Sequence, residues 1–358
     1  TAQLDSYTRA DKIVGASLAW VRHGRIVARH HVGMADRDAG QAVGDSTIWH
    51  WGSITKTLTA VSVLQLRDQG LLSLDAAAAD RVPELRLIHD GYGSIDAVTI
   101  RMLLSHSSGF QNPTWPYGTG EPWEPFEPTS WAQLVAMMPW QELRFAPGSR
   151  YGYSNPAYIY LARIIESATG DPWIAYVQQN LWTPLGMTRS YVNRTPPYLS
   201  AQRSNRYSVE KDSTGAVVTV AGGRDFDPGV TIPNGGWNAP MDDIATWMGF
   251  LTVSADGRRA ASLLSRATLA EMWTPVVPVG RDSLVTESMG LGFFLYQVHG
   301  RKLVGHTGSQ GGFRSFMAFD PATGQGVIGV VNTSNDVDPN SESGFTATFY
   351  SALGLLAQ

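Results

Sequence analysis

The order of strand-like and helix-like segments is the feature that most restricts the fold of this chain. Strand patterns occur near both ends of the sequence, first over Gly15–Val32 and again between Gly292 and Asn332. The segments between them read mostly as short helices and as loops rich in Pro, Gly and Trp. The economical topology is one antiparallel sheet built from both ends of the chain, with helices packed against it.

We therefore expect an α/β (α+β) fold with an inserted, mostly helical domain. Residues 1–70 and 236–358 are predicted to form the sheet domain, and residues 71–235 the inserted domain, with the functional site between them. Within the inserted part, the Pro-rich stretch Asn112–Pro128 is predicted to be a loop, because it suits neither a helix nor a strand.

Composition excludes several classes of protein. Hydrophobic residues make up 43% of the 358 residues, enough for a substantial core, and the net charge of -4 argues against a nucleic-acid-binding surface. No apolar run approaches the roughly 18–20 residues that cross a bilayer. The absence of cysteine excludes disulfides, thiolate metal sites and cysteine nucleophiles. The chain starts at Thr1 without a hydrophobic leader, as a processed or trimmed protein would, and we favour a periplasmic or secreted location over the cytoplasm.

A serine stands at the start of the most apolar helix pattern in the chain. The segment after Ser53 has no Gly or Pro until Gly70, and it is apolar on most faces, which predicts a central, buried helix. Ser53 and Lys56 form an S-x-x-K motif, and residues three apart share one face of a helix. Lys56 can therefore exchange a proton with the Ser53 hydroxyl, while the helix N-terminus favours negative charge there.

The S-x-x-K spacing alone is not specific, because Ser208 and Lys211 repeat it. That second copy lies in a polar segment with no helix after it, and we interpret it as a solvated turn. Ser53 could also be an ordinary helix N-cap, so further motifs are needed to decide between the two interpretations.

Two further motifs follow in the chain. Tyr153 and Asn155 form Y-S-N just before a predicted helix, and His306 opens an H-T-G-S-Q-G-G segment that is predicted to end a strand in a tight turn. Each has an ordinary structural explanation, as a capping loop or as a glycine hairpin. Their occurrence in this order with S-x-x-K is much harder to explain by chance.

Together these motifs resemble those of the serine β-lactamase and penicillin-binding protein superfamily. The similarity is to the branch that holds class C β-lactamases, DD-peptidases, D-amino-acid peptidases and related esterases, whose motifs are S-x-x-K, Y-x-N and K/H-T-G. Supporting phrases extend the resemblance over nearly the whole chain: Gly70–Asp75, Ile100–Gly109, Pro147-Gly148, Pro184–Met187 and Phe319–Pro321.

The resemblance implies a role for each motif residue. Ser53 would be the nucleophile, and Lys56 and Tyr153 the proton relay, with the choice of base between these two left open. Asn155 would lie in the cleft, and the backbone N–H groups of Ser53 and Ser309 would form the oxyanion hole, beside Gly308. Tyr151 is a rival to Tyr153, although no Asn follows it at the same spacing.

Two histidines and one arginine are further candidates for a role at or near the site. His306 replaces the Lys of β-lactamases on this strand and puts lactamase activity in doubt. Arg314 is the one nearby cation that could bind substrate, although the sequence does not show which face it occupies. His106, in the L-L-S-H-S-S-G phrase, is interpreted as a structural residue of the helical domain.

The predicted function is a serine hydrolase that acts on esters or peptide-like amides through a Ser53 acyl-enzyme. Two alternatives stay open: a true class C-type β-lactamase, and a penicillin-recognising sensor that acylates without turnover. The expected partner is a small or peptide-like substrate, without nucleic acid, metal or cofactor, and the oligomeric state is not predicted. Loops set substrate choice, so the sequence does not name the substrate.

Overall fold

A nine-stranded antiparallel sheet organises the computed structural model, which describes residues 1–110, 128–252, 263–281, 285–335, 337–338 and 341–358. The predicted loop at 112–128 therefore lies almost wholly outside the described residues. The strand order is β3-β2-β1-β13-β12-β11-β10-β9-β8. Its members are β1 (Gly15–Arg22), β2 (Arg25–Asp36), β3 (Gln41–Ala42), β8 (Val277–Arg281), β9 (Val285–Met289), β10 (Phe294–Val298), β11 (Arg301–Gln310), β12 (Phe313–Phe319) and β13 (Gln325–Val331).

The two ends of the chain meet inside this sheet. Strand β1 pairs with β13 from Ala16 opposite Val331 to Arg22 opposite Gln325, and the pairing is antiparallel throughout. The prediction of one antiparallel sheet assembled from both ends is confirmed. Strands β8 and β9 were not predicted.

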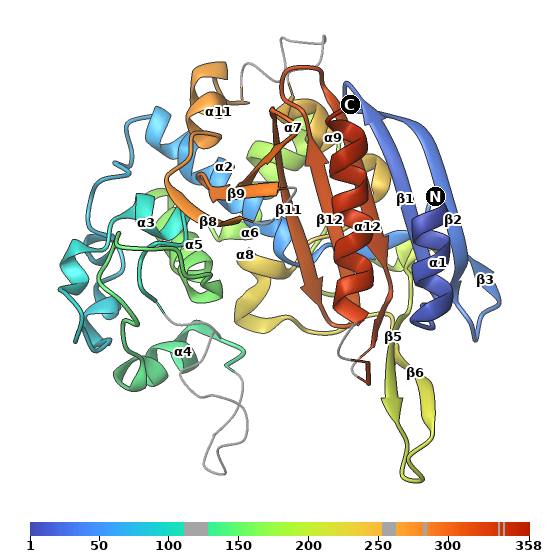
Figure 1. Ribbon diagram of the computed structural model, residues 1–358. Helices are drawn as coiled ribbons and strands as arrows, with labels where there is room; N and C mark the ends of the chain where they lie inside the picture. The colour runs from blue at the N-terminus through green and yellow to red at the C-terminus, as the bar shows by residue number, and fades with distance from the viewer. Residues whose placement is uncertain (111–127, 253–262, 282–284, 336, 339–340) are drawn as a thin grey trace.

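Helices cover both faces of the sheet. Helices α1 (Ala2–Ala10) and α12 (Ser341–Leu356) lie side by side over one face, in blue and red in Figure 1. Their apolar side chains join a core that includes Leu4, Phe316 and Leu353. On the other face lie α2 (Thr55–Asp68) and α9 (Met241–Leu251), whose side chains share a larger core with helices from the middle of the chain.

Helix α2 is as buried as its sequence predicts, since every residue from Thr55 to Leu66 is buried. Two of its buried polar side chains, Thr57 and Thr59, each accept a hydrogen bond from a tryptophan indole at 3.0 Å. The helix ends before Gly70, whose φ of 75° only glycine adopts readily. A short 3₁₀ turn, Gly52–Ile54, precedes α2 and carries Ser53.

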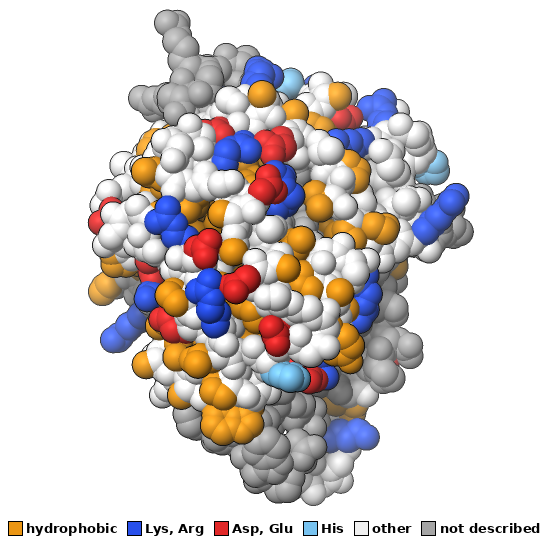
Figure 2. Space-filling view, turned by 90° about the vertical axis from the view of Figure 1, so that its left-hand side faces the viewer, with side chains coloured by type: hydrophobic (Ala, Val, Ile, Leu, Met, Phe, Trp, Pro, Cys, Tyr) orange, Lys and Arg blue, Asp and Glu red, His pale blue; other side chains and the backbone are white. Residues whose placement is uncertain are grey.

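The middle of the chain is mostly helical. The α-helices there are α3 (Ile100–Leu104), α4 (Trp131–Met137), α5 (Asn155–Thr169), α6 (Trp173–Val177), α7 (Thr183–Leu185) and α8 (Ile232–Gly235), and α11 (Arg266–Met272) follows α9. Short 3₁₀ turns and one π-helical turn, Gln178–Trp182, connect them. Figure 2 shows one side of the molecule, where charged side chains of both signs are mixed.

Two small sheets lie outside the nine-stranded sheet, and one of them includes a segment that was predicted to be a turn. One has the order β14 (Thr333–Asn335), β5 (Arg206–Lys211) and β6 (Val217–Gly223), and the other pairs β4 (Ile48–His50) with β7 (Asn238–Pro240). The prediction of a solvated turn at Ser208–Lys211 is wrong, because this segment is strand β5. Tyr207 and Val209 are buried on alternate positions, and the polar end of the strand hid this period in the sequence.

Strand β11 also differs from the prediction, which ended it at His306. It continues to Gln310, and the chain turns at Gly311 and Gly312, which both have positive φ. Strand β10 pairs only with residues 301–305 of β11, so residues 306–310 have no strand partner on that side among the described residues. This free edge faces the candidate active site.

Candidate active site

Ser53 and Lys56 lie together at the start of helix α2. The Nζ atom of Lys56 lies 3.1 Å from Ser53 Oγ, 2.8 Å from Asn155 Oδ1 and 2.9 Å from the carbonyl oxygen of Asn234. The lysine side chain is fully buried. A long cationic side chain is rarely buried without a carboxylate partner, so this lysine needs a chemical reason.

Burial changes the protonation of Lys56. Loss of solvent lowers its pKa well below the ordinary lysine value, which favours the neutral amine. A neutral amine has two N–H groups, and the carbonyl oxygens of Asn155 and Asn234 accept both. In that form the remaining lone pair is available to the Ser53 hydroxyl, because Nζ and Oγ lie within hydrogen-bond distance of each other. This arrangement is suited to removing the hydroxyl proton.

Tyr153 reaches the same serine from the loop before α5. Its ring centroid lies 5.0 Å from Lys56 Nζ. Burial raises the pKa of Tyr153, and a hydrogen bond with Ser53 opposes this rise only in part. The tyrosine is therefore a neutral phenol that can donate a proton to a leaving group. Tyr151, its rival in the sequence, packs against Phe294 with ring centroids 6.3 Å apart and does not line the pocket.

Two glycines bring backbone N–H groups together beside Ser53. A Cβ atom on Gly308 would stand 2.1 Å from the carbonyl oxygen of Trp51 and 3.1 Å from the Ser53 nitrogen. A Cβ atom on Gly52 would stand 2.8 Å from the Ser309 nitrogen. Strand β11 and the Ser53 turn therefore approach closely only because both residues lack side chains. The close approach allows two N–H groups to address one oxyanion.

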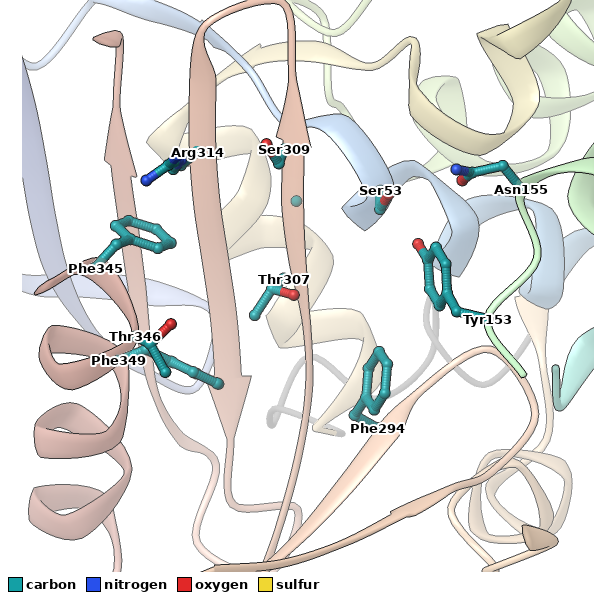
Figure 3. Close-up of a pocket in the computed structure, with 11 residues that line it drawn as sticks. Ser53, Tyr153, Asn155, Phe294, Thr307, Ser309, Arg314, Phe345, Thr346 and Phe349 are labelled. Atoms are coloured by element: carbon teal, nitrogen blue, oxygen red, sulfur yellow. The ribbon is translucent and has the colours of Figure 1, made fainter. Parts of the chain in front are cut away.

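These groups border a pocket of about 400 Å³. Figure 3 shows Ser53, Tyr153 and Asn155 at one end and Arg314 and the start of helix α12 at the other, with β11 between them. The lining residues are Ser53, Tyr153, Asn155, Phe294, Thr307, Gly308, Ser309, Arg314, Phe345, Thr346 and Phe349.

Comparison with known proteins assigns the family. A family model described as Beta-lactamase matches residues 2–348. The chain belongs to the β-lactamase family. Esterase EstB of Burkholderia gladioli is 34% identical over 260 residues, which cover 66% of this chain and 64% of the esterase. The match thus spans less than two thirds of that relative's length.

Two other β-lactamase family relatives match over almost all of this chain. Penicillin-binding protein 4 of Amycolatopsis lactamdurans is 29% identical over 369 residues, which cover 99% of this chain and 89% of the relative. The octameric penicillin-binding protein homologue from Pyrococcus abyssi is 26% identical, with a TM-score of 0.78 over 98% of this chain and 76% of the homologue. The predicted family and fold are confirmed, and the relatives are serine hydrolases.

His306, the first residue of the H-T-G motif, is not among the residues that line the pocket. It is buried, its Nδ1 donates to the carbonyl oxygen of Thr307 at 2.5 Å, and its ring lies 5.1 Å from that of Phe294. Burial lowers the pKa of His306 to about 3. It is therefore a neutral side chain behind Tyr153.

The sequence did not show which face of the sheet Arg314 occupies, and the structure places it at the pocket. It lies opposite Ser309 in the β11–β12 register and lines the same pocket as Ser53. It is the one lysine or arginine among the lining residues that the structure describes. The pocket therefore carries a permanent positive charge, but at the end next to α12.

Several site residues could not be read from the sequence. Asn234 contributes a backbone oxygen to Lys56, and its Nδ2 donates to Asn155 Oδ1 at 3.1 Å. Phe345 and Phe349 reach the pocket from the C-terminal helix. Within the described part of the chain, no cluster of three or more His, Asp or Glu side chains could hold a metal, and no helix is long and apolar enough to span a membrane.

Proposed function

We propose that this chain is a serine hydrolase whose Ser53 forms an acyl-enzyme with esters or peptide-like amides. The observation that carries the proposal is the 3.1 Å contact of Ser53 Oγ with Nζ of the buried Lys56, beside an open pocket. Burial also lowers the pKa of Lys56, which favours its neutral form. An unassisted serine is a weak nucleophile at neutral pH, and this contact supplies the base.

In the acylation step, the Ser53 proton moves to Lys56 Nζ while Oγ bonds to the substrate carbonyl carbon. The resulting oxyanion accepts hydrogen bonds from the N–H groups of Ser53 and Ser309. When the bond to the leaving group breaks, Tyr153 gives its proton to that group and regains one from Lys56. Asn155 holds the amine in position throughout.

Deacylation reverses the roles. Water attacks the acyl carbon and gives one proton to the relay of Tyr153 and Lys56, and this proton returns to Ser53 Oγ as the carboxylic acid leaves. Lys56 ends neutral, as it began. No step requires a metal or a cofactor.

Esters with apolar acyl groups are the substrates we favour. Phe294, Phe345 and Phe349 give the pocket aromatic walls, and His306 brings no charge next to the reacting atoms. The identity to esterase EstB supports the same choice. Arg314, at the other end of the pocket, is the observation that keeps a class C-type β-lactamase or a peptidase as the second candidate, because their substrates carry a carboxylate.

The deciding experiment measures kcat/KM on p-nitrophenyl butyrate, a D-alanine p-nitroanilide and nitrocefin, with Ser53→Ala as the blank. We expect the ester to be hydrolysed most efficiently. Stoichiometric acylation by penicillin without turnover of any substrate would instead identify a sensor protein, and residual turnover in Ser53→Ala would refute the proposal itself.

We also propose that the site lies between the sheet domain, residues 1–70 and 236–358, and the inserted domain, residues 71–235. The contributions of β11 and of the Ser53 turn on one side and of the Tyr153 loop on the other support this division. A periplasmic or secreted location is likewise proposed, and cell fractionation of the natural host tests it.

A further inference from the structure

A buried histidine outside the three motifs lies directly against Tyr153. His106 follows helix α3 and has no exposed surface. Its ring centroid lies 4.3 Å from that of Tyr153, with an angle of 32° between the ring planes, and 5.1 Å from that of Tyr158 on α5. His106 therefore fills the space between the Tyr153 loop and the helix behind it.

The same histidine accepts a hydrogen bond from each neighbour of Tyr153. The N–H of Gly152 donates to the His106 carbonyl oxygen at 2.8 Å, and the N–H of Ser154 donates to His106 Nδ1 at 3.1 Å. One residue thus fixes the backbone on both sides of the tyrosine. Because Nδ1 accepts, the proton of the neutral ring is assigned to Nε2.

This arrangement carries two energetic costs at one residue. His106 has a φ of 52°, in the left-handed region that side chains with a Cβ adopt only under constraint. Its Nε2 is buried without a hydrogen-bond partner among the described residues. An ordinary packing residue would need neither feature, and costs of this kind gather where a functional geometry is imposed.

We propose that His106 is a positioning residue that holds the Tyr153 phenol against Ser53 by clamping the backbone on both sides of Tyr153 and supporting its ring. The inference rests on the role proposed above for Tyr153. It extends the three sequence motifs by a fourth element, the loop after α3, which the sequence analysis interpreted as structural only.

The mechanism of this effect is geometric. Tyr153 can donate a proton to the leaving group only while its hydroxyl stays within hydrogen-bond reach of the reacting atoms. Displacement of a catalytic group by about 1 Å can cost a hundredfold in rate. Loss of His106 would free both ends of the Gly152–Ser154 segment and leave a cavity behind the phenol.

The test compares His106→Ala with His106→Asn. Asparagine tolerates the left-handed backbone, and its Oδ1 can replace Nδ1 as the acceptor for Ser154, but it has no ring. Tyr160→Phe is the matched control. Tyr160, on α5, is fully buried like His106, and its hydroxyl donates to Gln141 at 3.0 Å, away from the site. Its loss lowers stability without touching Tyr153.

Three quantities are measured at a temperature well below the Tm of each variant. They are kcat and KM for p-nitrophenyl butyrate, and the rate at which a fluorophosphonate labels Ser53. The final extent of labelling gives the number of competent sites, that is, of active sites able to react. For His106→Ala we expect kcat per competent site to fall about ten- to a hundredfold with KM nearly unchanged. His106→Asn should recover part of this loss, and Tyr160→Phe should keep the wild-type kcat despite a lower Tm.

The inference is overturned if His106→Ala keeps the wild-type kcat per competent site. It is also overturned if Tyr160→Phe, with the same decrease in Tm as His106→Ala, shows the same decrease in kcat. Tyr153→Phe separates the two proposals. Normal turnover in Tyr153→Phe would refute the proposed relay, whereas a slow Tyr153→Phe beside a fast His106→Ala would refute only the positioning role.

Discussion

The Nζ atom of Lys56 lies 3.1 Å from Ser53 Oγ, and carbonyl oxygens take up its other two hydrogen-bonding directions. An amine in this setting works as a base only when it is neutral. Its pKa, lowered by burial, makes that form available at a lower pH than for an exposed lysine.

The first prediction follows from this protonation state. The kcat/KM for p-nitrophenyl butyrate should rise with pH through the lowered pKa of Lys56 and then level off, because only the deprotonated amine accepts the Ser53 proton. Lys56→Arg should lose about a hundredfold or more in kcat, since a guanidinium stays protonated. Lys56→Arg with wild-type turnover would contradict the assignment of the base.

A second prediction concerns the serine that is acylated. A fluorophosphonate probe followed by peptide mapping should label Ser53 alone, because Ser53 has a base beside it in an open pocket. Ser208→Ala is the matched control, because Ser208 has the same S-x-x-K spacing to Lys211 but lies in strand β5. Labelling should disappear in Ser53→Ala and persist in Ser208→Ala, and a label on Ser208 would refute the choice of nucleophile.

Gly308 provides a third, steric test. A methyl group there would collide with the carbonyl oxygen of Trp51 at 2.1 Å and separate β11 from the Ser53 turn. Gly308→Ala should lower kcat by about a hundredfold or more through the oxyanion hole and destabilise the fold by about 1–3 kcal/mol. Gly354→Ala, in α12 with open space around it, should keep full activity and a Tm at least as high as wild type.

His306 leads to a fourth prediction, on acid stability. Its folded pKa of about 3 is below the unfolded value near 6.5, so the unfolded chain binds the proton first as the pH falls. Stability should therefore be lost between about pH 6.5 and pH 3, by about 2 kcal/mol for this residue at pH 5. Denaturant unfolding at pH 7 and pH 5 should show a smaller loss for His306→Gln, and an equal loss would contradict a neutral, buried His306.

The fifth prediction concerns Arg314. If its charge binds a substrate carboxylate, Arg314→Met should lower kcat/KM for nitrocefin about ten- to a hundredfold, the scale of one charge-assisted hydrogen bond. The effect on p-nitrophenyl butyrate, which has no carboxylate, should be much smaller. Parallel losses on both substrates would show that Arg314 supports the pocket structurally instead.

The sequence was sufficient to predict a helix or strand where its hydrophobic pattern was long and clear. Helix α2 was predicted as buried because apolar residues occupy most of its faces, and the structure buries it from Thr55 to Leu66. Strand β5 was missed because only Tyr207 and Val209 show the alternation, in a strand of six residues that ends in polar side chains. A pattern that short does not separate a strand from a turn.

The site shows the same limit more sharply. Ser53, Lys56 and Tyr153 belong to motifs and could be named in advance. Asn234 acts through a backbone oxygen, which every residue type has, so no sequence signal marks it. Phe345 lies far from Ser53 along the chain, and only the packing of α12 against the sheet brings it to the pocket.

The free edge of β11 between residues 306 and 310 has a consequence for how this enzyme can change. An open strand edge offers alternating N–H and C=O groups. Under the proposed function, these backbone groups would pair with the amide or ester group that very different substrates share. Recognition of the reacting bond would then be separate from recognition of the groups attached to it, which would depend on pocket side chains such as Phe294 and Arg314. Single substitutions at the pocket rim would then give new specificities, while the strand proposed to align the scissile bond stays the same.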